Sequence, residues 1–461
     1  MENLLQLDKD TIAAIATGTG KSGIGIVRIS GPLVSVICKT LTQKKLEPRK
    51  AHFSKIYSGN EIIDECVVIF FPGPASFTGE DVLEIQAHGN IFLLNKIMNT
   101  VFSLGVREAR PGEFSERAFL NNKIDLTQAE AIADLINAGS EQAASCAVQS
   151  FQGVFSEQIN LLVDEIIKLR IYTEASIDFP EEEIDFLDTQ IVKEGLTKIE
   201  ERFLSLKQKA HQGVVLSEGM TIVLAGRPNA GKSSLLNALS GRDSAIVTDI
   251  AGTTRDILKE NISIDGIPLH VLDTAGIRES NDPVEIAGIN KAWQEIKKAD
   301  LVLFLSDSSL SEDCNLENLW PEVFKYLPLE FIEKKIILIR NKADISGIKK
   351  GVTTSGFQFP VITLSVKNED DISMLFNYLK SFIGFGSNSE NQFSARRRHI
   401  QALDEAYKFI KNGIAQLNNH GAGELLAEDL RQAQTCLGSI TGQLLPDELL
   451  GKIFSDFCIG K

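Results

Sequence analysis

One glycine-rich segment constrains this chain more than any other feature. The segment TIVLAGRPNAGKSSLLNAL (residues 221–239) starts as a short apolar strand, passes through a loop and continues as an amphipathic helix. The loop fits the pattern G-x-x-x-x-G-K-[ST], with Gly226, Gly231, Lys232 and Ser233 in the fixed places. Such glycines let backbone N–H groups face one anion, while the lysine reaches terminal phosphates and the hydroxyl can ligate Mg²⁺. A strand before the loop and a helix after it therefore predict a nucleotide site.

Two motifs that follow the loop specify which nucleotide is bound. The sequence Asn341-Lys342-Ala343-Asp344 closes an apolar strand, and the Asp344 carboxylate can accept both the ring N–H and the exocyclic amine of guanine. Adenine lacks this donor pair and would leave a buried carboxylate unpaired, which discriminates strongly against it. Ser365-Val366-Lys367 follows another apolar strand and would brace the guanine O6 through its backbone.

Two further motifs lie between the glycine-rich loop and the guanine motifs, and they concern the phosphates. Asp273-Thr274-Ala275-Gly276 closes a strand, where the aspartate can hold Mg²⁺ through water and the glycine N–H can sense the γ-phosphate. Residues 252–256 (GTTRD) supply a threonine for Mg²⁺, for which we select Thr254. Motifs in this order, each at a strand end in an alternating α/β pattern, predict a Ras-like GTP-binding domain. Many such domains carry Gln just after DTAG to orient water, but Ile277 stands here, so Glu279 and Glu285 are the local alternatives.

The chain of 461 residues is too long for one core, and its pattern changes along its length. Residues 1–120 read as a mixed α/β domain, with extended stretches at 11–17, 25–29, 62–71 and 81–87 and a helix at 91–104. Gly20-Lys21-Ser22 imitates the end of a phosphate loop but lacks the upstream glycine, so we interpret it as a turn.

Long helical periodicity starts at Thr127 and returns from about Ser394 to the end of the chain. We expect these two regions to pack together, with the nucleotide domain inserted into one discontinuous helical domain. The predicted domains are residues 1–120, helical 121–215, GTPase 216–383 and helical 384–461. The acidic run at 178–186 has no histidine beside it, so we favour a solvated turn over a metal site.

Charge and cysteine usage narrow the class of protein. A net charge of −15 excludes a generic polyanion binder, so any RNA contact needs a local basic patch. The six cysteines are scattered without a C-x-x-C pair, which fits a reducing cytoplasm rather than a zinc site or disulfide framework. We find no run of apolar residues long enough for a membrane span and no secretion signal.

Motifs along essentially the whole chain resemble one family. The segments GRPNAGKSSLLNAL, DIAGTTRD, DTAGIRE, FPGPASFTGEDVLEIQAHG, RPGEFSERAFLNNKIDLTQAEAIADLI and the terminal FCIGK are similar to those of the tRNA modification GTPases of the MnmE (TrmE) family. The N-terminal and C-terminal motifs are much more specific than the GTPase motifs, which many families share.

This resemblance implies a cytoplasmic homodimer whose N-terminal domain holds the dimer and binds a tetrahydrofolate derivative, either 5-formyl- or 5,10-methylene-tetrahydrofolate. It implies that the chain acts with the flavoprotein MnmG, in a heterotetramer-type complex, on C5 of the wobble uridine of certain tRNAs. The group added would be aminomethyl or carboxymethylaminomethyl. GTP hydrolysis to GDP would be coupled to K⁺-dependent dimerisation of the GTPase domains.

The resemblance also implies roles for single residues. Glu285, in preference to Glu279, would orient the attacking water, and Cys458 has a chemical role or, as the alternative from its residue type, packs as a small buried side chain. The other implied sites are Ser233 and Thr254 for Mg²⁺; Asn229, Thr248, Ile250 and Thr253 for K⁺; Arg28, Glu84, Lys123 and Lys461 for folate; and Gly226, Asn229, Ala230, Gly231, Lys232, Ser233, Ser234, Thr248, Thr253, Thr254, Asp273, Thr274, Ala275, Gly276, Asn341, Lys342, Asp344, Ser365, Val366 and Lys367 for GTP.

Two other functions stay open from the sequence. A GTP-gated RNA or ribosome assembly factor would share the GTPase core, but it usually adds an RNA-binding module, and the only basic run here is Arg396-Arg397-Arg398-His399. A folate-dependent methyltransferase with a regulatory GTPase is disfavoured, because residues 1–120 show no evident nucleophile or acid–base pair.

Overall fold

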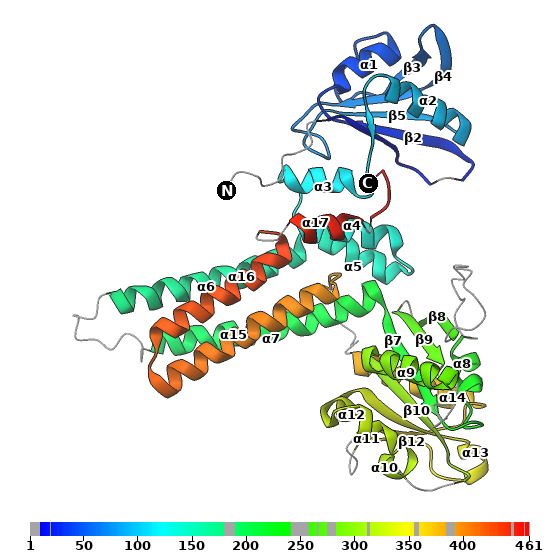
Figure 1. Cartoon of the computed structure of the whole chain (residues 1–461), viewed down its shortest axis with the longest axis vertical. Coiled ribbons are helices and arrows are strands. Elements are labelled where there is room, and N and C mark those ends of the chain that lie inside the picture. The colour runs from blue at the N-terminus through cyan, green and yellow to red at the C-terminus, as the bar shows by residue number, and fades with distance from the viewer. Residues whose placement is uncertain are drawn as a thin grey trace. The chain divides into compact units, whose positions relative to one another are not determined.

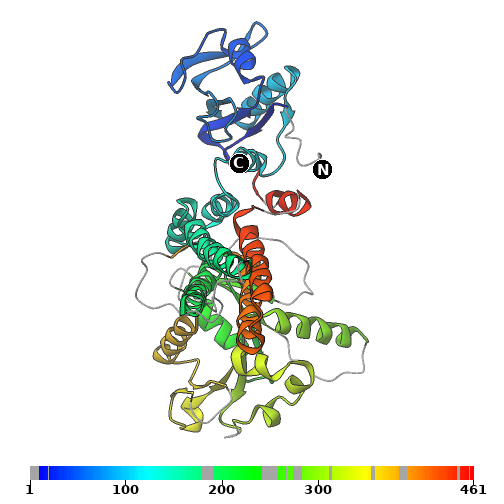
Figure 2. The same cartoon turned by 90° about the vertical axis from the view of Figure 1, so that its left-hand side faces the viewer.

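The structure is a computed structural model that describes residues 10–18, 20–178, 190–240, 258–264, 267–273, 283–310, 314–354, 359–383, 392–443, 447–455 and 457–460. The chain divides into two compact units (Figures 1 and 2). One unit comprises Met1–Ala133, Ser150–Leu204 and Gln401–Lys461, and the other comprises Asp134–Gln149 and Ser205–Ile400.

The first unit contains a six-stranded sheet with the order β3-β4-β5-β2-β1-β6. All neighbouring strands are antiparallel except β1 and β6, which are parallel. The strands are β1 (Ile12–Ile15), β2 (Ser22–Ser30), β3 (His52–Ser58), β4 (Glu61–Phe71), β5 (Val82–Gly89) and β6 (Arg107–Glu108).

Side chains alternate along these strands, so the sheet has two different faces. Val27, Ile29, Leu83 and Ile85 belong to the core formed with α1 (Val34–Thr42) and α2 (Ile91–Ser103). Arg28 and Glu84, which lie between them in sequence and directly opposite each other in the register, belong to the other face. Around that other face, α3 (Glu113–Leu120) supplies Phe114 to a small cluster with Ile12, Ala14 and Phe77.

The strands and the helix predicted for residues 1–120 are all present, with ends shifted by a few residues. The prediction omitted α1, α3, the edge strand β3 and the two-residue strand β6. The strand β3 buries only Ser54 and Ile56 among its seven residues, so its apolar pattern is weak. The helix α1 buries five of its nine residues and was missed all the same.

The helical part of the first unit comes from both halves of the sequence. Helices α6 and α16 lie side by side, and the Tyr407 hydroxyl on α15 donates to the Glu200 carboxylate on α7 at 2.8 Å (Figure 1). This confirms the expectation that the C-terminal helices pack against the earlier ones. The helices are α4 (Leu126–Asn137), α5 (Glu141–Phe151), α6 (Val154–Asp178), α7 (Gln190–Glu218), α15 (Arg397–His420), α16 (Gly423–Thr441) and α17 (Asp447–Ser455). Most of α5, the ends of α4 and α7 and the start of α15 fall in the second unit.

The second unit is built on a seven-stranded sheet with the order β12-β13-β11-β10-β7-β9-β8. The five inner strands are parallel, and their near-continuous apolar runs are buried on both faces, as parallel sheets require. The expected P-loop GTPase fold is therefore present. Its strands are β7 (Met220–Gly226), β8 (Leu258–Ile264), β9 (Ile267–Asp273), β10 (Leu301–Asp307), β11 (Ile336–Asn341), β12 (Gly351–Thr353) and β13 (Val361–Thr363).

Helices complete this α/β unit, and those that follow β7 in the sequence differ in length. The longer ones are α8 (Lys232–Ser240), α9 (Pro283–Lys298) and α14 (Glu369–Ile383); the short ones are α10 (Leu316–Leu319), α11 (Glu322–Tyr326), α12 (Leu329–Lys335) and α13 (Ala343–Ser346). Among the helices that the structure describes, none combines the length and hydropathy needed to cross a membrane.

Candidate nucleotide site and a second polar site

The glycine-rich loop joins the end of β7 to the start of α8. Gly226 and Gly231 have φ values of +138° and +99°, and a Cβ at either would overlap a neighbouring oxygen or nitrogen atom. Only glycine therefore fits these two places. The Lys232 amine donates to the carbonyl oxygens of Gly226 at 2.9 Å and Arg227 at 3.3 Å, so it lies over the loop that would hold the phosphates.

The loop opens onto a cavity of about 470 Å³ at the carboxyl ends of the parallel strands, where α/β sheets commonly bind ligands. Nearly every described residue that the sequence predicts for GTP contributes to its wall. The lining residues are Asn229, Gly231, Lys232, Ser233, Ser234, Asn341, Lys342, Asp344, Ile345, Ser365, Val366 and Lys367. Sequence reasoning did not select Ile345.

Asn341 connects the phosphate loop to the two guanine motifs. Its side chain is buried, with Nδ2 donating to the Ala230 carbonyl at 2.9 Å. Its Oδ1 accepts from the backbone N–H groups of Lys342 at 2.8 Å and Val366 at 3.1 Å. One amide thus fixes the relative positions of three loops that end three different strands.

Asp344 is exposed at the edge of the cavity and remains a carboxylate. The Ser365 hydroxyl donates to its Oδ1 at 2.7 Å, and this hydrogen bond lowers the pKa of Asp344 below its ordinary value. A charged, acceptor-only group is what the paired donors of guanine require.

Asp307, at the end of β10, is a residue that sequence reasoning missed. Its Oδ2 accepts from the Lys342 amine at 2.6 Å, which holds the Lys342 side chain extended across the cavity edge. Burial alone would raise the pKa of Asp307, but the bonds from Lys342 and Ser309 outweigh it and the pKa is lowered. An aspartate that closes the apolar strand LVLFLSD was the available signal.

Part of the predicted nucleotide and ion sites lies outside the described residues. Asp273 ends β9 and Glu285 lies in the first turn of α9, but their side chains are not described. The predicted residues outside the described ranges are Thr248, Ile250, Thr253, Thr254, Thr274, Ala275, Gly276 and Lys461. Within those ranges, no cluster of three or more His, Cys, Asp or Glu side chains could hold a metal ion by itself.

A second polar site lies on the Arg28 face of the six-stranded sheet. Arg28 donates to Glu84 Oε1 at 2.9 Å and to the carbonyl oxygen of Gly460 at 3.3 Å. Its guanidinium also lies 5.9 Å from the ring centre of Phe77 and 5.8 Å from that of Phe114. Two strands, a loop, a helix and the C-terminal tail thus meet at one cation.

A buried ion network supports this second site. Arg117, whose side chain is 3% exposed, donates to Glu113 at 3.0 Å, Asp10 at 2.7 Å and Glu80 at 3.2 Å. Glu80 in turn accepts from the Ser30 hydroxyl at 2.7 Å, two residues from Arg28. Burial by itself would raise the pKa of Glu113, but bonds from Arg107, Arg110 and Arg117 lower it. Sequence reasoning missed this network, because its members are spread over more than 100 residues.

The other predicted residues of this region are near the same loop or tail. The Lys123 amine donates to the Pro74 carbonyl at 3.0 Å, in the loop that carries Phe77. Cys458 is exposed, which excludes its alternative reading as a buried small side chain, and its carbonyl accepts from the Gly112 N–H at 3.3 Å. Two buried cysteines differ from Cys458. Burial and the negative charge of the nearby Asp64 raise the pKa of the Cys66 thiol to about 12, and burial raises the pKa of the Cys146 thiol to about 11.

Comparisons with known proteins identify the family of this chain. Residues 11–123 match the family model described as "GTP-binding protein TrmE N-terminus", and residues 126–458 match "MnmE helical domain". Proteins named "tRNA modification GTPase MnmE" are similar along their whole length. The one from Marinobacter nauticus is 53% identical over 99% of this chain and 100% of its own, and the one from Proteus mirabilis is 51% identical over 98% and 99%.

Among solved structures, the G domain of the T. maritima FeoB iron transporter is 26% identical over 36% of this chain and 96% of its own, with a TM-score of 0.27. That score is too low to support an argument, so the family assignment depends on the sequence matches. Two family models cover nearly the whole chain, and full-length relatives share half of its residues. The chain belongs to the MnmE family of tRNA modification GTPases.

Proposed function

We propose that this chain hydrolyses GTP and, with the flavoprotein MnmG, takes part in adding an aminomethyl-type group at C5 of the wobble uridine of certain tRNAs. The supporting observation is the cavity at the carboxyl ends of β7, β11 and β13, where Asp344 presents a charged carboxylate and Asn341 joins the base loop to the phosphate loop. Both features suit a guanine nucleotide, and family membership supplies the tRNA reaction.

Two described residues beside the phosphate loop, Ser233 and Asn229, have side chains that suit Mg²⁺ and K⁺. Ser233 lies in the first turn of α8 and lines the cavity, so its hydroxyl is placed to share Mg²⁺ with phosphate oxygens, which agrees with the preference of Mg²⁺ for few protein ligands. Asn229 lines the same cavity with φ +63° and offers a neutral amide oxygen that suits a monovalent cation. Bound beside the phosphates, such a cation would stabilise the negative charge that develops on hydrolysis. We propose Thr254 as the second Mg²⁺ ligand, Thr248, Ile250 and Thr253 as further K⁺ ligands, and Glu285 as the residue that orients water.

The second polar site fits a folate. Both bonds from Arg28 go to Oε1 of Glu84, and within the described residues Oε2 accepts no hydrogen bond. That oxygen is therefore placed to accept a donor from a pterin ring, and Phe77 and Phe114 supply aromatic surface beside it. The bound folate would supply the one-carbon unit. We propose Lys123 and Lys461 for its acidic tail and an exposed Cys458 as a participating thiol. From family membership we also propose that the chain forms a homodimer, that it joins MnmG in a heterotetramer-type complex, and that it is located in the cytoplasm.

Mass spectrometry of wobble uridines tests the tRNA function. Cells lacking this protein should lose the C5 group, and reintroducing the wild-type chain should restore it, whereas an Asp344→Ala chain should not. Unchanged nucleosides in the deletion strain would refute the proposal.

GTP turnover tests the ion mechanism separately. The rate should be much faster in KCl than in NaCl at equal ionic strength, and Asn229→Ala should remove most of the difference. Equal rates in the two salts would exclude the potassium role while leaving the tRNA function open.

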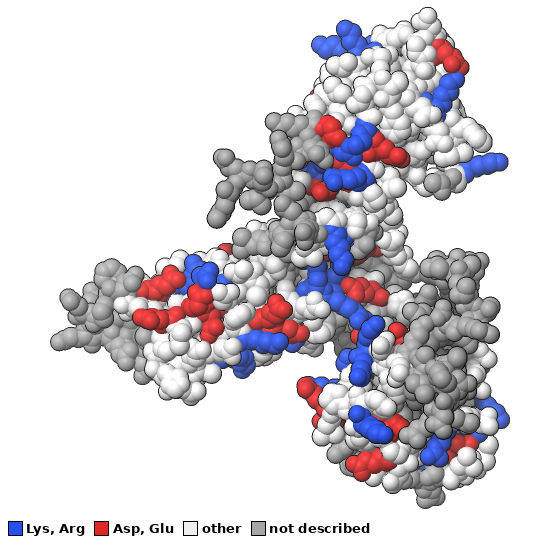
Figure 3. All heavy atoms as spheres, viewed as in Figure 1, with Lys and Arg blue, Asp and Glu red and all other residues white. Residues whose placement is uncertain are grey.

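An RNA or ribosome assembly factor is the second candidate, and the basic run gives it little support. Arg396 pairs with Asp134 at 2.8 Å, and Arg397 pairs with Asp300 at 2.9 Å and Glu218 at 3.2 Å. His399 is buried. Acidic side chains accompany basic ones over the visible face in Figure 3. The run therefore serves intramolecular ion pairs rather than a free RNA-binding patch.

A further inference from the structure

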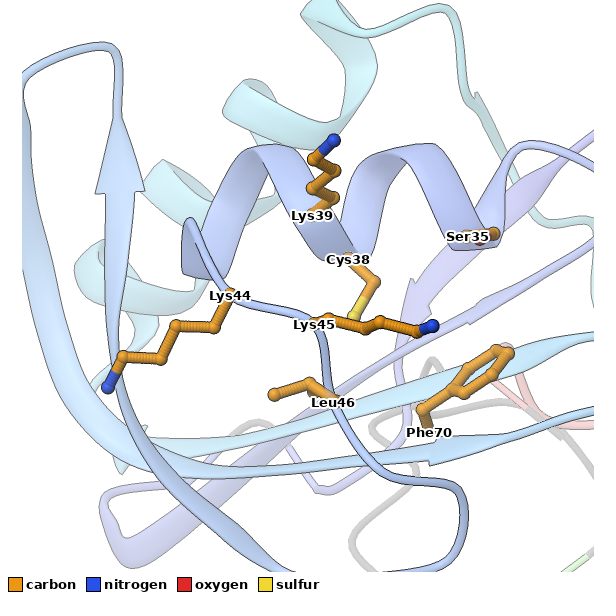
Figure 4. A pocket seen from close by; sticks show the side chains of 7 residues that line it. All are labelled: Ser35, Cys38, Lys39, Lys44, Lys45, Leu46 and Phe70. Atoms are coloured by element: carbon orange, nitrogen blue, oxygen red, sulfur yellow. The ribbon is translucent and has the colours of Figure 1, made fainter.

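A separate cavity of about 340 Å³ lies in the first unit, between α1, the segment that follows it and β4 (Figure 4). Its lining residues are Ser35, Cys38, Lys39, Lys44, Lys45, Leu46 and Phe70. Phe70 packs against the core beneath α1 and α2, so this cavity is on the face of the sheet opposite to Arg28 and Glu84. It is therefore distinct from the second polar site.

The inner wall of this cavity is apolar and uncharged. Cys38 and Leu46 are each 6% exposed, and the ring of Phe70 is partly buried beside them. Burial raises the pKa of the Cys38 thiol, so the sulfur stays protonated. A planar apolar group placed against this wall would gain the ordinary stabilisation of removing apolar surface from water, and Phe70 offers an aromatic face.

The rim of the cavity is basic, although the chain as a whole carries a net charge of −15. Three lysines and no acidic residue line it, and within the described residues their amines make no hydrogen bond or ion pair. Other lysines of the same domain differ: Lys55 lies 3.3 Å from Glu65, and Lys96 lies 2.5 Å from Glu61. Unpaired like charges around a cavity raise its affinity for an anion.

The three lysines do not contribute equally. Figure 4 shows the Lys45 side chain running toward the Phe70 ring, whereas Lys39 and Lys44 point away from it. An acidic group at the mouth of the cavity would meet the Lys45 amine directly. Lys39 and Lys44 would act only through their charge at longer range.

We propose that this cavity binds a small molecule in which a planar aromatic ring carries one acidic group. The ring lies against Phe70, Leu46 and Cys38, and the acidic group pairs with Lys45. The volume is near the lower end of the range for small-molecule sites, roughly 300–1,000 Å³, which limits the ligand to one or two fused rings.

Calorimetric titration of the full-length protein, saturated with Mg²⁺ and GDP, tests this proposal with 2-naphthoate as the probe. We expect saturable binding at one site per chain, and at least tenfold weaker binding of 2-naphthamide, which has the same rings but no charge. Lys45→Gln should weaken naphthoate binding about tenfold, because it removes a charge-assisted hydrogen bond. Lys55→Gln, which removes a lysine outside the cavity, should leave binding unchanged.

Two more variants locate the binding site. Ser35→Phe, at an exposed position of the wall, should fill the mouth and abolish binding, while Arg28→Ala should leave binding intact. The variants Lys45→Gln, Lys55→Gln and Ser35→Phe should keep the wild-type rate of GTP turnover, which shows that they are folded. Absence of saturable binding at millimolar naphthoate, equal binding by Lys45→Gln and Lys55→Gln, or loss of binding in Arg28→Ala would each overturn the proposal.

Discussion

The Asn341 side-chain amide donates to the carbonyl oxygen of Ala230 at 2.9 Å across 111 residues of sequence. Ala230 lies in the phosphate loop, and Asn341 opens the loop that selects the base. In the proposed GTP site, the loop for the phosphates and the loop for the base therefore share one buried hydrogen bond. Base recognition and phosphate binding should fail together when this bond is removed.

Asn341→Ala is predicted to weaken GDP and GTP binding about 10- to 100-fold. The substitution leaves the Ala230 carbonyl and the N–H groups of Lys342 and Val366 without their partner, so the two loops are no longer fixed relative to each other. The expected loss corresponds to about 1.4–2.8 kcal/mol of binding free energy. Fluorescence titration with a methylanthraniloyl-labelled GDP measures the change. Asn315→Ala, which removes an asparagine that caps α10, is the matched control and should bind normally. Wild-type affinity in Asn341→Ala would contradict the linkage.

Asp344→Asn is predicted to exchange guanine for xanthine specificity. Xanthine has a carbonyl where guanine has its exocyclic amine, so it suits an amide donor and no longer suits a carboxylate. Competition between GDP and xanthosine diphosphate measures the exchange, and unaltered preference for GDP would exclude Asp344 from base contact.

The pH dependence of GDP binding follows from the Asp344 carboxylate. Its pKa lies below the ordinary value of 3.8, so its contribution to affinity is present above that pH and is lost only as the pH falls further. GDP affinity should therefore show no carboxylate titration between pH 5 and 8. A midpoint inside that range would show that another group controls binding.

The nucleotide site could be predicted from sequence because each of its motifs is short and closes a strand. Gly226 to Ser233, and Asn341 to Asp344, are contiguous, and parallel strands bring their carboxyl ends to one edge of the sheet. Asp307 also ends a parallel strand, β10, but was not selected from the sequence.

The second polar site could not be assembled in this manner. Arg28 meets Glu84 across 56 residues and Gly460 across 432, and no local pattern encodes either contact. The sequence nominated Arg28 and Glu84 through the family resemblance alone. The aromatic rings of Phe77 and Phe114 and the buried Arg117 network emerged only with the fold.

Gly460→Ala is predicted to displace the C-terminal tail and to weaken binding of 5-formyl-tetrahydrofolate at least tenfold. Gly460 has φ +92°, and an added Cβ would lie 2.5 Å from the Ile15 carbonyl oxygen and 2.9 Å from the Ala16 backbone. The tail must then move, which breaks the Arg28 contact to the Gly460 carbonyl. Equilibrium dialysis with labelled folate measures the loss.

Gly451→Ala is the matched control for this prediction. Gly451 lies in α17 with open space around its Cα, so alanine should be tolerated and should stabilise the helix by about 0.5–1 kcal/mol. Equal folate affinity in the two alanine variants would show that the tail geometry at Gly460 has no part in the site.

Glu113→Gln is predicted to lower the free energy of opening of α3 by about 3 kcal/mol at pH 7. The variant removes a buried carboxylate from Arg107 and Arg117, and breaking a buried ion pair typically costs 3–5 kcal/mol. The value lies at the lower end because Arg117 keeps Asp10 and Glu80 as partners. Hydrogen exchange of α3 amides measures it, with Glu116→Gln, on the same helix and paired at 3.3 Å with an exposed Arg110, as the control.

The pH dependence of this stabilisation distinguishes the ion network from simple packing. Because the pKa of Glu113 lies below its ordinary value of 4.5, its contribution is complete above that value and is lost as the pH falls through the lowered pKa. The difference in α3 protection between wild type and Glu113→Gln should therefore be constant from pH 6 to 8 and shrink below about pH 4.5. If the difference persists undiminished in acid, the substitution acts through shape alone, and the charge of Glu113 does not hold α3 against the Arg28 site.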